Sequence, residues 1–225
     1  MKEYLPILTH CPLFADAQPE DILAMLHCLG AHTQSFARGA RIFHAGQPVT
    51  EMGLVLEGCV QVEQEDYWGN RTILTRAHTR ELFGEVYACL PAQPIAVSVC
   101  AVEPCTVLML DFHRITNPCS SACSFHTRLV QQLLHILATR TMALTEKIRH
   151  ISQRTLRKKL LSYLSAQAQR AGNSSFSIPF DRQALADYLC ADRSALSAEL
   201  GRMRDEGLLT FHRNQFTLLN QPEEL

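Results

Sequence analysis

Long apolar runs are absent from the sequence: no stretch approaches the roughly 20 consecutive apolar residues that a membrane-spanning helix requires. The first residues also lack the basic-then-apolar order of a signal peptide. We therefore expect a cytoplasmic protein with no membrane partner. Hydrophobic residues make up 47% of the 225 residues and charged residues 19%. This composition predicts a globular chain with a substantial core and excludes a disordered one.

Lysine and arginine are scarce in the first half of the sequence. Residues 1–112 contain 6 of them against 13 aspartates and glutamates, a net charge of −7. Residues 113–225 contain 15 against 9, a net charge of +6, so the overall charge of −1 is an average over two unlike parts. This asymmetry predicts two modules with different partners, of which only the basic one suits a polyanion such as DNA.

Short segments of alternating polarity dominate from about residue 32 to residue 112. Residues 52–63 alternate, residues 69–70 mark a hairpin turn, and residues 105–110 form a nearly continuous apolar run typical of a buried strand. Short strands separated by frequent turns predict a small all-β barrel or sandwich. Residues 1–31 read as helical, with a glycine as their stop.

A long helix is predicted from about residue 119 to residue 150. Its apolar side chains recur at alternating spacings of four and three residues over three heptads, with one polar member. This regularity favours a parallel pair of helices, so we expect a homodimer; a two-sided core helix of a monomer is the alternative. A second stripe, which includes Leu129 and Leu133, can pack on the barrel. The predicted dimer interface consists of Val130, Leu134, Leu137, Thr141, Leu144, Ile148 and Ile151.

The most specific pattern lies between residues 181 and 218. Asp181 and Asp192 each precede a helix-forming segment whose first amides their side chains can cap. Two such helices around a three-residue break predict a helix-turn-helix, whose second helix enters the DNA major groove. Residues 208–218 add a hairpin with a polar tip, which makes the module a winged helix; a helical hairpin for protein contact is the alternative. The predicted DNA contacts are Arg182, Arg193, Ser194, Ser197, Arg202, His212, Arg213 and Asn214.

In this order, an acidic barrel, a long helix and a basic winged helix resemble the CRP/FNR family of bacterial transcription regulators over nearly the whole chain. The spaced barrel glycines and the segments 81–85 and 182–189 carry the resemblance. It implies an α+β chain with a double-stranded β-helix (jelly-roll) sensor barrel in residues 1–116, a dimerisation helix in 117–151 and a winged helix-turn-helix DNA-binding domain in 152–225. It also implies a small-molecule effector that repositions the DNA-binding domains on a palindromic operator, and a contact with RNA polymerase.

Three positions depart from the family's pattern. Many members have a glutamate directly after the residue that matches Arg193, and an arginine at the position that matches Ala198. This chain has Ser194 and Ala198 there. The glycine that is common in the turn is replaced by Cys190. We therefore do not expect the family's usual operator sequence.

The resemblance places a cyclic-nucleotide-type pocket in the barrel, but a cyclic nucleotide needs a cation for its phosphate, normally an arginine shortly after the Gly-Glu pair at 84–85. No lysine or arginine occurs from Glu81 to His113. We therefore expect another effector, such as a small organic acid or aromatic ligand below Phe83. The two N-terminal cysteines are too few for an iron–sulfur cluster. The predicted effector pocket comprises Leu82, Phe83, Gly84, Glu85, Val97, Ser98, His126 and Val130.

Nine cysteines, an odd number, read first as reduced thiols and second as metal or redox groups. Cys119, Cys123 and His126 stand at positions i, i+4 and i+7, on one face of the predicted long helix. Thiolates and an imidazole on one stripe are compatible with zinc, iron or haem, or with a thiol switch. A buried thiol pair without chemistry is the alternative, so the cofactor stays unknown.

Signatures of catalysis are absent as well. The sequence contains no Gly-x-Ser-x-Gly, phosphate loop or His-Glu-x-x-His. The histidines of the predicted barrel, His44, His78 and His113, are too far apart for the metal site of a cupin enzyme. We therefore expect a regulator and not an enzyme. A metal-dependent cupin-like enzyme and a sensor or adaptor without DNA binding are the alternatives.

Overall fold

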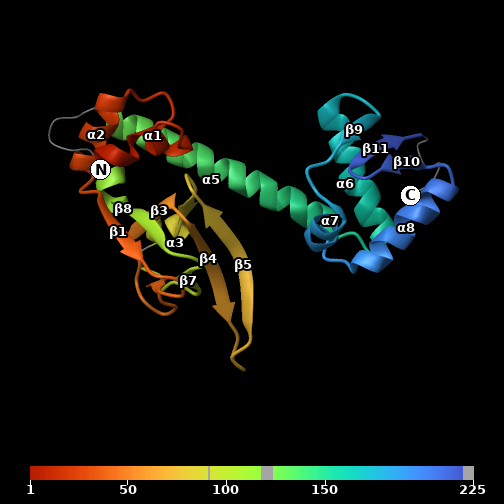
Figure 1. The fold of residues 1–225 in the computed structure, drawn as a ribbon, viewed down its shortest axis with the longest axis horizontal. Helices are drawn as coiled ribbons and strands as arrows, with labels where there is room; N and C mark the ends of the chain where they lie inside the picture. Colours follow the sequence, from red (N-terminus) through yellow and green to blue (C-terminus); the bar gives the residue numbers. More distant parts are fainter. Residues whose placement is uncertain (91, 118–123, 220–225) are drawn as a thin grey trace. The chain divides into compact units, whose positions relative to one another are not determined.

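The computed structural model describes residues 1–90, 92–117 and 124–219, and Figure 1 shows the course of the chain. Two compact units are formed, Met1–Leu137 and Ala138–Leu225, here called the N-terminal unit and the C-terminal unit. The long helix α5 (Ser124–Ile151) begins in the first and ends in the second. Within the described ranges, no helix combines the length and the apolar content that crossing a membrane requires.

Short helices open the N-terminal unit. They are η1 (Lys2–Tyr4), α1 (Leu5–Leu8), η2 (Pro12–Phe14) and α2 (Pro19–Cys28). Proline stands in the first turn of the last three. Its fixed φ suits a helix start and its missing N–H has no partner to lose there. The predicted stop is confirmed, because α2 ends just before Gly30, which has a φ of +61°.

Two four-stranded antiparallel sheets form the barrel, in the orders β1-β8-β3-β6 and β2-β7-β4-β5. This arrangement confirms the predicted jelly-roll, with the hairpin turn at 69–70 joining β4 to β5. The strands are β1 (His32–Phe36), β2 (Arg41–Phe43), β3 (Glu51–Glu57), β4 (Cys59–Glu65), β5 (Arg71–His78), β6 (Leu82–Phe83), β7 (Ser98–Ala101) and β8 (Cys105–Asp111).

The first of these sheets separates two cores, because successive side chains of a strand point to opposite faces. Leu54 of β3 belongs to a core shared with α2 and α5, whereas its neighbour Val55 belongs to the core inside the barrel. Helix α5 contributes Leu129 and Leu133 to the first core. The first part of the stripe predicted to pack on the barrel therefore does so, whereas Ala143 at its end is exposed.

The barrel interior is tightly filled around Phe83. A Cβ added to Gly53 of β3 would lie 2.0 to 2.7 Å from atoms of the Phe83 ring, so only glycine fits there. Two short helices border the barrel, α3 (Glu85–Ala88) and α4 (Phe112–Thr116). The carboxylate of Asp111 caps the second of them by accepting from the backbone N–H groups of His113 and Arg114.

The exposure of the predicted seam changes along α5. Val130 and Leu137 are half-buried against the core of the N-terminal unit. Leu134, Leu144 and Ile148 are 61%, 62% and 60% exposed. An exposed apolar row along a helix is typical of a surface that meets another chain.

In its described part, the C-terminal unit combines the end of α5 and the helices α6, α7 and α8 with a three-stranded sheet of order β10-β11-β9. Its elements are α6 (Leu156–Ala171), β9 (Ser175–Ser177), α7 (Arg182–Tyr188), α8 (Arg193–Asp205), β10 (Leu209–His212) and β11 (Gln215–Leu218). Leu160, Leu185 and Leu196 are fully buried where the helices meet. The unit is the winged helix that the sequence predicts.

Candidate nucleic-acid interface

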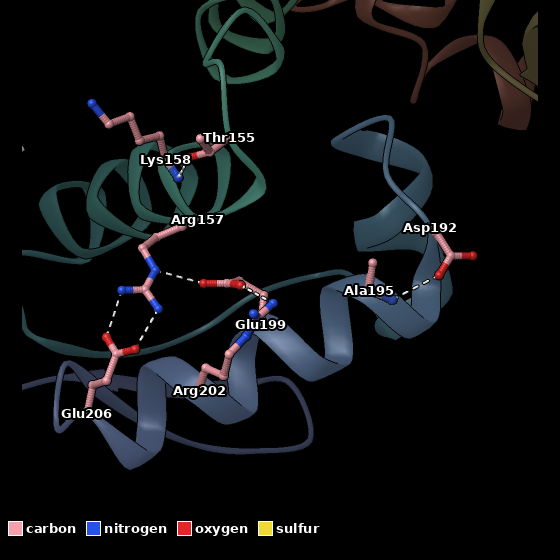
Figure 2. A network of polar contacts seen from close by, with 8 residues as sticks. All are labelled: Thr155, Arg157, Lys158, Asp192, Ala195, Glu199, Arg202 and Glu206. Carbon is pink, nitrogen blue, oxygen red and sulfur yellow. Dashed lines mark hydrogen bonds and ion pairs between the residues drawn. The ribbon is translucent and has the colours of Figure 1, made fainter.

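Two aspartates set the starts of α7 and α8. The Asp181 carboxylate accepts a hydrogen bond from the backbone N–H of Ala184 at 2.8 Å. Asp192 accepts one from Ala195 at 2.9 Å (Figure 2). Such caps satisfy amides that no helical carbonyl can reach and stabilise a helix by about 1 kcal/mol each. Both predicted caps are confirmed, and they fix the boundaries of the helix-turn-helix.

A lysine from a third helix holds the turn between α7 and α8. Lys159 of α6 donates to the backbone carbonyls of Leu189 and Cys190 at 3.0 and 3.5 Å. Cys190 has a φ of +50°, in the left-handed region that glycine adopts at little cost. The departure noted at Cys190 therefore puts a side chain at a position whose backbone favours glycine.

The first turns of α8 present basic and small side chains to solvent. Arg193, Ser194 and Ser197 are all exposed. The hydroxyl of Ser197 donates to the carbonyl of Arg193 at 3.0 Å, so its oxygen remains available as an acceptor. The backbone amides and dipole at a helix N-terminus favour negative charge. This end of α8 therefore suits a phosphate or the edge of a base.

Three arginines surround one cavity beside this helix end. Arg182, Arg193 and Arg213 line its volume of about 730 Å³, together with Asp181, whose single negative charge they outweigh. The Arg182 guanidinium lies 4.8 Å from the centre of the Phe211 ring, and burial lowers its pKa below the usual value. Arg182 is thus held by stacking, whereas Arg193 and Arg213 are exposed.

The wing is a tight hairpin. His212 pairs with Gln215 in the ladder between β10 and β11, so the turn consists of Arg213 and Asn214 alone. Arg213 has a φ of +54°. The Asn214 side chain donates to the carbonyl of Ile178 at 3.0 Å and so fastens the wing to the segment after β9. His212 and Arg213 are among its exposed polar side chains.

An ion-pair network joins α6 to α8 and the residue after it, and no sequence pattern predicted it (Figure 2). Arg157 of α6 donates to Glu199 of α8 at 2.7 Å and, through both terminal nitrogens, to Glu206 at 2.7 Å. Arg202 pairs with the same Glu199, which is only 7% exposed, at 2.5 Å. The hydrogen bonds hold the pKa of Arg157 above and that of Glu206 below the usual value. Arg202, predicted as a DNA contact, thus pairs with a carboxylate of its own helix while its side chain stays 65% exposed.

The residues predicted for the effector pocket lie in two places. Leu82 and Val130 pack in or against the core shared with α2 and α5, whereas Phe83 and Val97 lie inside the barrel. Leu82 and Phe83 are neighbours in one strand, so their side chains point to opposite faces. Alternation within that strand could have revealed this division. The predicted pocket is therefore not one cluster.

The remaining predicted pocket residues sit at the barrel's margin or on α5. Glu85 is 4% exposed in the first turn of α3, after Gly84 at a φ of +75°. Ser98 accepts a hydrogen bond from the backbone N–H of Ala45 at 3.3 Å. The hydroxyl oxygen of Ser98, the first residue of β7, thus already has a hydrogen-bond partner. His126, on α5, belongs to a different environment.

His126 contacts a cysteine of another helix. Its ring is 6% exposed, and Nε2 lies 3.8 Å from the Sγ of Cys28, the last residue of α2. Cys119 and Cys123 lie outside the described residues. Among the residues that are described, no group of three or more His, Cys, Asp or Glu could hold a metal ion.

Comparison with known proteins covers both units. The cyclic nucleotide-binding domain matches residues 33–121, and the Crp-like helix-turn-helix domain matches residues 158–225. Catabolite activator protein of Thermus thermophilus is 21% identical, with 92% of this chain and 93% of that chain covered and a TM-score of 0.51. No curated protein sequence matches significantly.

Two further solved structures share the fold. CprK in complex with OCPA is 13% identical, with 89% of this chain and 90% of that chain covered and a TM-score of 0.60. CLP of Xanthomonas campestris, described as c-di-GMP responsive, is 16% identical, with 91% and 100% covered and a TM-score of 0.53. At such identities the likeness shows the fold alone.

A sensor-type barrel followed by a Crp-like winged helix defines the class: a DNA-binding transcription regulator with a sensor domain. The chain belongs to the CRP/FNR family of transcription regulators.

Proposed function

We propose that the chain acts as a homodimer that reads a palindromic DNA operator under the control of an effector other than a cyclic nucleotide. The observation that carries DNA reading is the cluster of Arg182, Arg193 and Arg213 around one cavity at the N-terminal end of α8. Arg193 contacts a phosphate or a guanine edge, and Ser194 and Ser197 contribute weaker, less selective hydrogen bonds.

The wing and the recognition helix have different tasks in this proposal. His212 and Arg213 lie on the DNA backbone, where they supply affinity without sequence preference. Arg182, held against the Phe211 ring, adds its positive charge to the same cavity and contacts DNA there. Arg202 and Asn214 contribute indirectly, because their side chains already bind Glu199 and the Ile178 carbonyl.

The exposed row on α5 supports dimerisation. Leu134, Leu144 and Ile148 each expose about three-fifths of their surface at heptad spacing, and a second α5 of the same sequence offers a matching row. A two-fold axis along this pair presents two helix-turn-helix units to two half-sites of a palindrome. We propose that Val130, Leu137, Thr141 and Ile151 complete the seam.

The effector is proposed to be a small organic acid or aromatic molecule. Ile95 and Val97 follow the Gly84-Glu85 pair, where a phosphate would need a cation, and both are buried. The similar CprK is seen in complex with OCPA, and CLP is described as c-di-GMP responsive, so proteins of this fold are associated with different small molecules. Bound at a promoter, the dimer is proposed to contact RNA polymerase, as the family's regulators do.

A second candidate for sensing is a metal, haem or thiol switch at Cys119, Cys123 and His126. The contact between His126 and Cys28 favours it, because it adds one more thiol beside the imidazole. Purification without oxygen, followed by metal analysis and an absorption spectrum, tests this candidate. A Soret band indicates haem, and a colourless, metal-free dimer favours an organic effector or a thiol switch.

The test of DNA reading is a gel shift at several salt concentrations on fragments of the protein's own promoter region. Arg193→Ala is expected to weaken specific binding by about 10- to 100-fold, the worth of one good base or phosphate contact. Arg38→Ala removes the same charge from an exposed site in the N-terminal unit and should bind as the wild type does. Wild-type affinity in a dimeric Arg193→Ala would contradict the assignment of α8 as the recognition helix.

A further inference from the structure

A second cavity, of about 850 Å³, lies within the C-terminal unit between the end of α5, α6 and α7. Its aromatic wall consists of Tyr163, Phe180 and Tyr188, whose ring centres lie 5.0 to 6.0 Å from one another. Phe180 and Tyr188 are half-buried, so part of each ring faces outward. The volume falls in the range of cavities that bind drug-sized molecules.

The hydroxyl of Tyr163 is the unusual polar group of this wall. Tyr163 is 2% exposed, and its hydroxyl has no hydrogen-bond partner in the part of the chain that the structure describes. Native proteins rarely bury a hydroxyl without a partner, because the lost hydrogen bond to water is not replaced. Burial raises the pKa of Tyr163 to about 12, so the group is a hydrogen-bond donor at neutral pH.

The polar wall carries an excess of positive charge. Arg170 of α6 forms an ion pair with Glu146 of α5, and Arg149 lies 3.5 Å from the same carboxylate. Two guanidinium groups thus share one carboxylate, which leaves a net charge of one positive unit for an incoming anion.

The proposed dimer seam shares Thr141 with the lining of the cavity but leaves the polar wall accessible. Glu146 stands two residues after Leu144 and two before Ile148. At about 100° per residue its side chain therefore projects from the face of α5 opposite to the seam.

We propose that this cavity binds a small aromatic carboxylate. Its ring packs against Phe180 and Tyr188, and its carboxylate pairs with Arg170 or Arg149. A small shift of the buried Tyr163 side chain, which binding would bring about, lets the Tyr163 hydroxyl donate a hydrogen bond to the same carboxylate. Each part of the molecule answers one feature of the cavity: the ring meets the aromatic wall, and the charge meets the excess guanidinium and the buried donor. The ligand would contact α5, α6 and α7 together and so restrain α7 against the end of α5.

Calorimetric titration of the full-length protein with three probes tests the chemistry. Indole-3-acetate has both ring and charge, indole-3-acetamide lacks the charge, and acetate lacks the ring. We expect indole-3-acetate to bind at least about tenfold more tightly than either of the others. Equal binding of the amide, or no binding of indole-3-acetate up to about 10 mM, would overturn the proposal.

Variants locate the site and separate binding from folding. Tyr163→Phe should weaken binding of indole-3-acetate about fivefold or more, yet melt at or above the wild-type temperature, because it removes a buried hydroxyl that has no partner. Arg170→Gln should weaken binding about tenfold. Arg154→Gln, an equal charge change at an exposed site outside the cavity, should leave binding unchanged.

Unchanged binding in both Tyr163→Phe and Arg170→Gln would contradict the site. Loss of binding in Phe83→Ala alone would place the ligand in the barrel and contradict it equally. The titration contains no DNA, so its outcome is independent of the operator experiment above.

Discussion

The two units use arginine in different ways. In the N-terminal unit, the barrel segment from Glu81 to His113 contains no lysine or arginine, and hydrophobic side chains fill the interior. In the C-terminal unit, Arg157 is paired with acids inside the protein, whereas Arg193 and Arg213 are exposed around a cavity. A count of charges therefore does not distinguish cations that stabilise the fold from cations that are available to a polyanion. Only the second kind predicts a nucleic-acid partner.

The largest expected effect comes from disrupting the α5 seam. Without the dimer, each C-terminal unit would bind DNA on its own. Leu144→Glu with Ile148→Glu puts like charges on two exposed seam positions, and we expect a monomer in analytical ultracentrifugation. Operator affinity should fall by about 100-fold or more, because the second half-site contact no longer benefits from the effective concentration that linkage provides.

Met142→Glu is the matched control for the seam. Met142 is 73% exposed on the same helix but is not one of the seam residues, so this variant should stay dimeric. A dimeric Leu144→Glu/Ile148→Glu variant, or a monomeric Met142→Glu variant, would contradict the predicted interface.

The next effect separates an arginine that stabilises the fold from one that is only exposed. Arg157→Ala leaves the buried carboxylate of Glu199 with Arg202 as its partner, and we expect the C-terminal unit to lose about 2 kcal/mol of unfolding free energy. Chemical denaturation measures the loss. Arg154→Ala, exposed three residues earlier, should change stability by less than about 0.5 kcal/mol. If both variants unfold alike, the network does not stabilise the unit as described.

Local rules predicted the winged helix well, and the network poorly. Asp181 and Asp192 cap the helices as their sequence positions indicate, because a cap acts over three residues. The bonds from Arg157 to Glu199 and Glu206 span 42 and 49 positions, and no periodicity links such residues before the helices pack. The ion pair of Arg202 with Glu199 was likewise not predicted, and its contact with DNA stays a prediction.

The barrel shows the opposite difficulty. Its strands and the hairpin turn at 69–70 follow from alternation, yet the effector pocket was predicted from the family resemblance. Adjacent residues such as Leu82 and Phe83 enter different cores because a strand alternates its faces. The sequence does not determine which face of a two-core sheet meets a ligand, since both faces are apolar.

A smaller effect is a pH dependence of the stability of the C-terminal unit, which a buried histidine causes. His150 is fully buried near the end of α5, with Nδ1 2.8 Å from Ser162 Oγ and Nε2 3.8 Å from Glu146 Oε1. Burial, and then the charge of Arg149, lower the pKa of His150 below its usual value of 6.5. The folded unit therefore keeps the neutral ring at a pH where the unfolded chain already binds a proton.

The sign of the pH effect follows from that difference. Above about pH 6.5 both states are neutral and His150 contributes no pH dependence. As the pH falls from about 6.5 to the lower native pKa, the unfolded state gains protons and stability declines. Thermal melts between pH 7.5 and pH 5 should show a shallower decline in His150→Gln than in the wild type. Parallel melting curves would show that His150 does not titrate differently on unfolding.

The smallest expected effect lies in the turn of the helix-turn-helix. A non-glycine residue in the left-handed conformation costs about 1–2 kcal/mol, which a glycine would relieve. Part of this stabilisation is offset, because glycine also gives the unfolded chain more conformational freedom. Cys190→Gly should therefore stabilise the C-terminal unit by about 0.5 kcal/mol, whereas Cys190→Ala, which keeps a Cβ at a φ of +50°, should not. Paired denaturation curves of the two variants measure this difference. A glycine variant less stable than the alanine variant would mean that the exposed cysteine side chain makes a favourable contact that offsets its backbone strain.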